Sequence, residues 1–129
     1  MRECGVETID FCLKTITIGK LLSRFFSLFR IVRNKRVKII ATYFECSDLL
    51  GTFVGIFAGV PSIVSNRRDM GHLLHSKYDI YYKILNRYFK VIVTVSNAVK
   101  NRVITFQKVN PEKVLTIYNG VDCARFIGG

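Results

Sequence analysis

Four short β-forming runs, separated by longer segments with helical periodicity, constrain the fold of this chain most strongly. The runs lie at 37–43, 62–65, 91–95 and 114–118 and are rich in Val, Ile and Thr. Runs this apolar are typical of strands that are buried on both faces of a sheet. Strands that alternate with helices indicate right-handed β-α-β units around a parallel sheet. The sequence therefore predicts an α/β fold.

The segments between the runs predict the helices and their first residues. Ser47 or Asp48 can cap a helix that is apolar almost all round and is expected to be buried, and Ser96 can cap the last long helix. No Gly-x-Gly-x-x-Gly turn is present, so the expected sheet is an incomplete doubly wound parallel sheet. The helices are expected at about 21–32, 49–58, 78–89 and 98–107, with one short helical turn at 110–112.

The net charge of +11 in 129 residues limits the kinds of partner that this chain favours. Such a charge attracts phosphates, nucleotides, nucleic acid or an anionic membrane surface. The alternative is a solvated surface that is merely rich in Lys and Arg. Nucleic acid ranks below the other partners, because no recognition motif is present and the aromatic residues do not lie among the basic ones.

The cysteines and the apolar segments indicate a cellular compartment. The four cysteines form no zinc-ligand spacing, so we expect free buried thiols in a reducing cytoplasm and no metal site. Charged residues near the N-terminus disfavour a secretory signal. The most apolar run, 49–60, is too short to cross a bilayer.

Polar residues follow the expected strands at their carboxyl ends, where open parallel sheets bind ligands. Arg67 and Arg68, flanked by Asn66 and Asp69, are the most suggestive, because guanidinium groups bind phosphate or carboxylate well. The alternative is that Arg67 pairs with Asp69 or Glu45 and only ties two loops together.

The first helix has a wide apolar face and a basic edge. Between 14 and 38 the chain carries eight basic residues and no acidic one. The basic edge predicts contact with anionic lipid, whereas the apolar face is expected to cover the sheet. The expected membrane-surface residues are Lys20, Arg24, Arg30, Arg33, Lys35 and Arg36.

The order of three segments resembles the N-terminal domain of family 4 glycosyltransferases, which are retaining enzymes of GT-B architecture. The first, 59–71, reads GVPSIVSNRRDMG and the second, 91–100, reads VIVTVSNAVK. The third contains NPEKV at 110–114, followed by IYNGVD at 117–122. The resemblance covers roughly residues 15 to 126.

The resemblance implies two facing Rossmann-like domains with the active site between them. The N-terminal domain receives the acceptor, and the C-terminal domain holds most of the nucleotide-sugar. Residues 1–126 would then be a partial N-terminal domain and 127–129 the start of the interdomain linker, without the donor domain. Asn119, Gly120 and Asp122 would lie at the hinge.

The resemblance leaves the catalytic residues unknown. Many members place a histidine just after the strand that corresponds to 63–65, where this chain has Asn66, Arg67 and Arg68. These three are therefore expected to line the cleft and bind substrate.

The implied activity is retaining transfer of a hexose from a nucleotide-sugar to a hydroxyl acceptor, which is either lipid-linked or a growing polysaccharide. The chain is expected to be inactive alone and to need no cofactor or metal. The alternative is a non-enzymatic basic module that binds an anionic membrane surface or partner. A cytoplasmic protein is expected, either free or peripheral at the inner membrane face.

Overall fold

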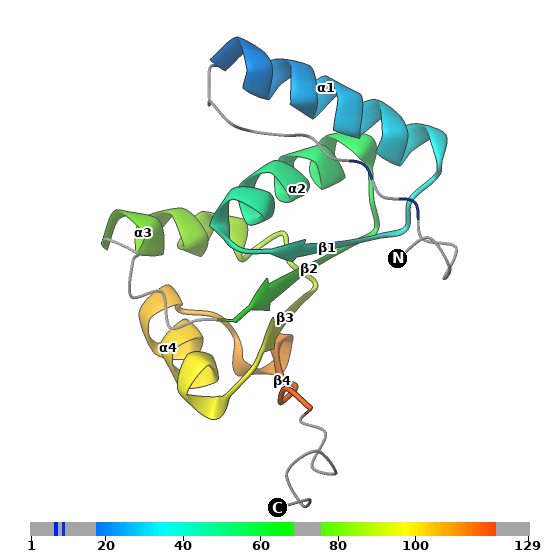
Figure 1. Ribbon diagram of the computed structural model, residues 1–129. Coiled ribbons are helices and arrows are strands. Elements are labelled where there is room, and N and C mark those ends of the chain that lie inside the picture. The colour runs from blue at the N-terminus through cyan, green and yellow to red at the C-terminus, as the bar shows by residue number, and fades with distance from the viewer. Residues whose placement is uncertain (1–6, 8, 10–17, 69–75, 121–129) are drawn as a thin grey trace, which may run out of the picture.

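The computed structural model describes residues 7, 9, 18–68 and 76–120, and these contain one parallel sheet of four strands in the order β1-β2-β3-β4 (Figure 1). Each strand pairs in parallel with the next one along the chain. The prediction of an α/β fold with a parallel sheet is confirmed. The strands are β1 (Ile39–Tyr43), β2 (Ser62–Arg67), β3 (Val91–Thr94) and β4 (Val114–Thr116).

Helices α2, α3 and α4 all pack on one face of this sheet. Alternate strand residues on that face, such as Ile63, Ile92 and Val114, are buried and belong to one hydrophobic cluster with Tyr82 and Val103. Right-handed crossovers between strands that follow one another in order place the helices on the same side. The helices are α1 (Ile18–Asn34), α2 (Glu45–Ala58), α3 (Ser76–Leu85) and α4 (Asn97–Gln107), and a 3-10 helix (Pro111–Lys113) precedes β4.

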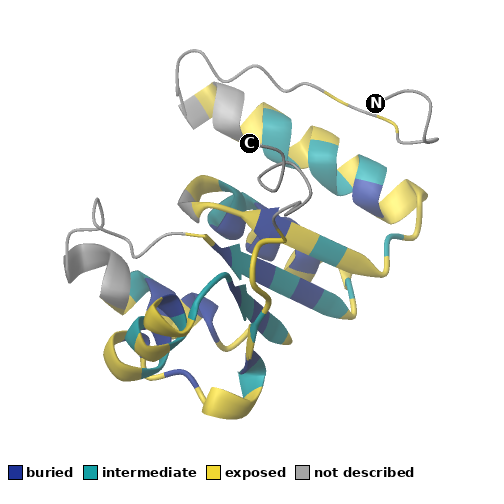
Figure 2. Cartoon of the chain, turned by 60° about the horizontal axis from the view of Figure 1, so that its bottom comes forward, coloured by how far each residue is buried: buried dark blue, intermediate teal, exposed yellow. Residues whose placement is uncertain are grey.

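The other face of the sheet is more exposed in the described part of the chain. Its residues include Ile39, Tyr43 and Leu115, with 65%, 48% and 52% of their surfaces exposed. Figure 2 shows the alternation of burial along the strands. The expectation of strands buried on both faces is therefore wrong for β1, because the described helices cover only one side.

Helix α2 begins earlier than the sequence predicted. Phe44 occupies the N-cap position, and neither Ser47 nor Asp48 does. Ser47 Oγ instead donates to the carbonyl of Phe44 at 2.9 Å, and Asp48 is fully buried inside the helix. The expectation that α2 is buried all round is also wrong, because Phe53 and Phe57 are 45% and 64% exposed.

Helix α1 packs on α2 and not on the sheet (Figure 1). The ring of Phe25 meets that of Phe57 edge-on at 5.9 Å, and Val32 is buried. Leu22 and Phe26, which belong to the expected apolar face, are 54% and 64% exposed. The expectation that α1 covers the sheet is therefore wrong: its apolar face is divided between contact with α2 and solvent.

Two local predictions are confirmed and one is wrong. Ser96 caps α4, because its Oγ accepts from the backbone N–H of Val99 at 3.3 Å. Asn110 Oδ1 accepts from the Glu112 N–H at 3.0 Å, with Pro111 in the first helical turn. Cys46 is exposed and not buried, since it lies in the first turn of α2, and the other cysteines lie outside the described residues.

Within the described residues, no helix combines the length and the apolar character that crossing a membrane requires.

Candidate functional site

The carboxyl ends of the four parallel strands meet at one edge of the sheet, where the chain leaves each strand. Two segments that are far apart in sequence touch there: Arg68 Nη2 donates to Asn119 Oδ1 at 3.4 Å. Arg68 follows β2 directly, and Asn119 lies three residues after the end of β4. The structure therefore brings together two of the residues that the sequence predicted separately.

Arg67 does not share this exposed position. Its side chain is only 9% exposed, and Nε donates to Ser65 Oγ at 2.7 Å. Nη2 donates to Asn86 Oδ1 at 3.3 Å, and the guanidinium lies over the ring of Tyr82 at 3.6 Å. Arg67 therefore faces the helix layer.

Asp48 is the ionic partner of Arg67. Asp48 Oδ2 lies 3.5 Å from Arg67 Nε and accepts from Ser65 Oγ at 3.0 Å and Tyr82 Oη at 3.1 Å. Thr42 Oγ1 donates to the other carboxylate oxygen. A buried charge is tolerated when it is paired and fully hydrogen-bonded, as here. The sequence alternative paired Arg67 with Asp69 or Glu45, whose side chains lie outside the described part, and it did not consider Asp48, which was expected to be a helix cap.

Asn66 occupies the face of the sheet opposite to Arg67. Strand register places it beside Tyr43, and its Nδ2 donates to the carbonyl of Thr42 at 3.1 Å. Asn66 is half-buried, so it lies close to the carboxyl edge and stabilises the pairing of β1 with β2 there.

Phe44 is a residue at this edge that the sequence did not single out. Its φ of 68° and ψ of 163° lie in a region that is almost restricted to glycine, and its side chain is 57% exposed. Such a conformation costs about 1–3 kcal/mol and is typical of functional sites. No pattern in the sequence signals it, because glycine would be the expected residue.

The segment after β4 carries two of the three expected hinge residues, Asn119 and Gly120. Residues 117–120 have no regular secondary structure, and Gly120 has no left-handed φ. Asn119 and Gly120 are exposed. Asp122, the third expected hinge residue, lies outside the described residues.

The expected membrane-surface residues have unequal positions. Arg30, Arg33 and Arg36 are exposed, whereas Arg24 is half-buried. Lys35 is also exposed and pairs with Glu7. The side chain of Lys20 lies outside the described part.

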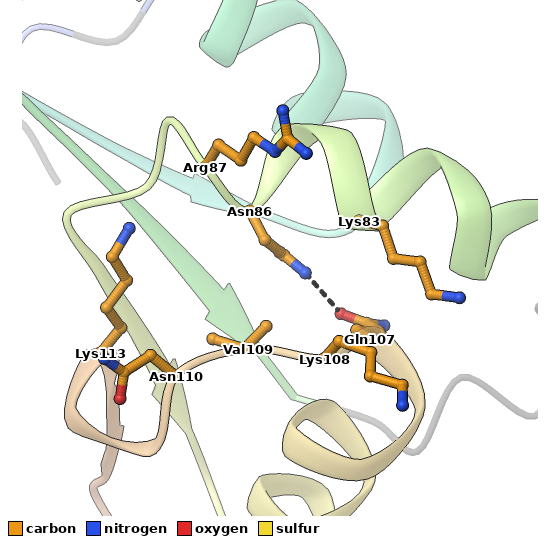
Figure 3. Close-up of a pocket in the computed structure, with 8 residues that line it drawn as sticks. All are labelled: Lys83, Asn86, Arg87, Gln107, Lys108, Val109, Asn110 and Lys113. Carbon is orange, nitrogen blue, oxygen red and sulfur yellow. Dashed lines mark hydrogen bonds between the residues drawn. The ribbon is translucent and has the colours of Figure 1, made fainter.

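A pocket of about 350 Å³ between the ends of α3 and α4 was missed by the sequence reasoning (Figure 3). The residues that line it come from the ends of α3 and α4 and from the connections to β3 and β4, all at the amino edge of the sheet. In the sequence, the only indication of this pocket is the pair of lysines at 108 and 113. The pocket is lined by Lys83, Asn86, Arg87, Gln107, Lys108, Val109, Asn110 and Lys113, and we call it the α3–α4 pocket.

The parallel sheet, with helices on one face and polar residues at its carboxyl edge, defines a Rossmann-like α/β domain. The chain belongs to glycosyltransferase family 4, whose family model matches residues 8–125. No curated protein matches the chain.

Two solved structures have a similar fold. Alr3699/HepE from Anabaena, solved in complex with UDP and glucose, has a TM-score of 0.70 at 17% identity over 84% of this chain. A glycosyltransferase from Rickettsia africae ESF-5 has a TM-score of 0.68 at 18% identity over 94% of this chain. This chain spans only 29% and 31% of the lengths of those two proteins.

Proposed function

We propose that this chain supplies the acceptor-side domain of a glycosyltransferase that moves a hexose from a nucleotide-sugar to a hydroxyl acceptor with retention of configuration. The observation that carries the proposal is the family match over residues 8–125. The acceptor is lipid-linked or a growing polysaccharide. In the proposed domain arrangement, 1–126 form the acceptor-side domain and 127–129 begin the linker to the donor side.

The carboxyl edge of the sheet is the proposed substrate-binding surface. Open parallel sheets bind ligands outside the carboxyl ends of their strands. Arg68 is exposed there and contacts Asn119, so its guanidinium can reach an anionic group while the segment after β4 holds it in position. Gly120 and Asp122 follow as the proposed hinge.

Arg67 has an indirect role in this proposal. Its guanidinium is engaged with Ser65, Asn86 and the ring of Tyr82. It therefore orders the end of β2, from which Arg68 and Asn66 extend, and does not itself contact substrate.

Glycosyl transfer depends on positioning two substrates and stabilising the departing diphosphate. Because the chain spans 29% of the structural neighbour that was solved with UDP and glucose, we expect the chain alone not to turn over donor. UDP release from UDP-glucose should equal that of buffer. Because the donor-side domain is expected to hold most of the nucleotide-sugar, calorimetry should detect only weak but saturable UDP-glucose binding, through contact of Arg68 with the diphosphate. Release of UDP above the buffer rate would contradict the expected inactivity. Absence of any saturable binding would contradict the proposed surface.

A second candidate function is attachment to an anionic membrane surface. It is favoured by the exposure of Leu22 and Phe26 on α1, 54% and 64%, beside the exposed Arg30 and Arg33. Exposed apolar side chains next to basic ones are typical of helices that lie in the membrane interface. Phe57 of α2, 64% exposed, extends this apolar surface.

Vesicle flotation tests the membrane candidate. We expect binding to vesicles that contain phosphatidylglycerol and little binding to phosphatidylcholine alone, with partial release at high salt. The variant L22S/F26S should lose binding. The matched control I80S/I84S removes two exposed residues of α3 at the same spacing and should keep it. Equal binding by both variants would reject α1 as the attachment surface.

A further inference from the structure

We propose that the α3–α4 pocket is a binding site for a phosphate-bearing ligand, separate from the proposed substrate-binding surface. The residues that line the pocket lie where α3 and α4 end, before β3 and β4 begin. In a parallel sheet these connections are at the amino edge, opposite to the edge where ligands of such sheets usually bind. The two surfaces can therefore be tested independently.

The lining carries four basic side chains and no acidic one: Lys83, Arg87, Lys108 and Lys113. The C-termini of two helices face the same region and contribute roughly half a negative charge each. Four full positive charges exceed that sum, so the pocket is electropositive even after the helix ends are counted. Basic residues often stabilise the C-terminal ends of helices. This role would explain one or two of the four basic residues but not all of them.

The basic groups are available for a ligand. Among the described residues, no carboxylate lies within ion-pair distance of Lys83, Arg87 or Lys108. Lys113 Nζ donates to the carbonyl of Phe89 at 3.3 Å, which holds its side chain and leaves its other two N–H groups free to donate. Figure 3 shows the basic residues placed around the pocket, and they come from separate segments.

The floor of the pocket adds a donor that lacks a protein partner. Gln107 is only 5% exposed, and its Oε1 accepts from Asn86 Nδ2 at 3.3 Å. Its Nε2 has no hydrogen bond with any described residue, and it stays accessible to solvent, because it is not among the buried polar atoms without a partner. This amide can therefore donate to an acceptor oxygen of a ligand in the pocket.

The size and chemistry of the pocket indicate the ligand class. A volume of about 350 Å³ is near the lower end of the range for small-molecule sites, roughly 300–1,000 Å³. Ammonium groups bind phosphate as point charges, and the neutral amides can bind the remainder of the ligand. The phosphate can belong to a free metabolite or to a lipid headgroup.

Titration with inorganic pyrophosphate, followed by backbone amide NMR of the whole chain, tests the proposal. We expect saturable shifts at 107–113 and near Arg87. The variant K83Q/K108Q, which changes two exposed residues, should weaken binding by at least about tenfold, equivalent to about 1.4 kcal/mol. The control K38Q/K100Q removes the same charge outside the pocket and should bind as the parent does.

A second variant tests the pocket without removing any of its basic side chains. N110D places a negative charge in the pocket while keeping an oxygen that can accept from the Glu112 N–H. It should retain the fold and weaken pyrophosphate binding. Equal affinity in N110D, K83Q/K108Q and the control would overturn the proposal, as would shifts that spread over the basic surface without saturation.

Vesicles containing phosphatidic acid distinguish the two sources of the phosphate. Pyrophosphate binding without pocket-dependent flotation assigns the site to free phosphate compounds. Flotation that is lost in K83Q/K108Q, kept in K38Q/K100Q and prevented by pyrophosphate assigns it to a lipid headgroup. If the chain shows neither pyrophosphate binding nor flotation that depends on the pocket, this proposal is overturned. The glycosyltransferase proposal would not be affected, because it concerns the opposite edge of the sheet.

Discussion

Arg67 Nε lies 3.5 Å from Asp48 Oδ2, and both side chains are buried between the sheet and its helices. The pair connects the end of β2 with the first half of α2, and Tyr82 adds α3 through a hydrogen bond to the same carboxylate. Three elements are therefore held together beneath the carboxyl edge by one ion pair and its hydrogen bonds.

Replacing Asp48 with alanine should destabilise the fold strongly. The guanidinium of Arg67 would remain buried without its ionic partner, and breaking a buried pair in this way costs about 3–5 kcal/mol. Urea unfolding, monitored by circular dichroism, measures the loss of unfolding free energy. The control is R68A, which removes the exposed arginine that follows Arg67 in the sequence. It should change the free energy of unfolding by less than about 0.5 kcal/mol. Similar values for both variants would show that the buried pair is not important for stability.

Gly51 should not tolerate a methyl group. A Cβ at this position would lie 2.4 Å from Thr42 Cγ2, because α2 packs closely on β1. We expect G51A to lose about 1–3 kcal/mol of unfolding free energy. G19A is the matched control, since no atom of the described residues lies within 4 Å of an added Cβ there, and helix α1 should gain from alanine. Equal stability of G51A and G19A would contradict the close packing of α2 on β1.

Removing the hydroxyl of Ser96 should weaken α4. The Oγ of Ser96 accepts from the Val99 N–H, and loss of such a cap costs about 1 kcal/mol. Chemical denaturation of S96A measures the effect. S23A, at an exposed position inside α1, should be neutral or slightly stabilising. A neutral S96A would mean that water replaces the cap fully.

Arg68 and Asn119 should affect binding without affecting stability. Both are exposed, and their contact joins two segments at the carboxyl edge. We expect R68A and N119A each to weaken UDP-glucose binding by about tenfold, as loss of a charge-assisted or positioning hydrogen bond does. Calorimetry gives the affinity and thermal unfolding gives the stability. The control for charge is R102A, which removes one arginine from α4. It should bind UDP-glucose as the parent chain does.

The sequence predicted the element order well because strand and helix periodicities differ clearly. The alternation of short apolar runs with amphipathic segments located all four described strands, and the capping pattern located the start of α4 at Ser96. Strand ends were less accurate. β2 continues to Arg67, where polar residues remain paired with β3, and no hydrophobic pattern extends that far.

The positions of charged residues could not be predicted, because they depend on contacts between distant segments. Arg67 and Arg68 are adjacent and chemically identical, yet one is buried beside Asp48 and the other is exposed beside Asn119. Strand alternation sends the two side chains to different sides, and only the packing of α2 and α3 decides which side is covered. The α3–α4 pocket was missed for the same reason.

A map of backbone amide shifts during titration of the labelled chain with UDP-glucose tests the central claim most directly. If the carboxyl edge binds substrate, the largest saturable shifts will fall at Phe44, Arg68 and Asn119, and R68A will reduce them. The same titration with pyrophosphate should instead shift the amide resonances of residues that line the α3–α4 pocket. Saturable UDP-glucose shifts confined to the amino edge, or the absence of saturable shifts at the carboxyl edge, would contradict the proposed substrate-binding surface.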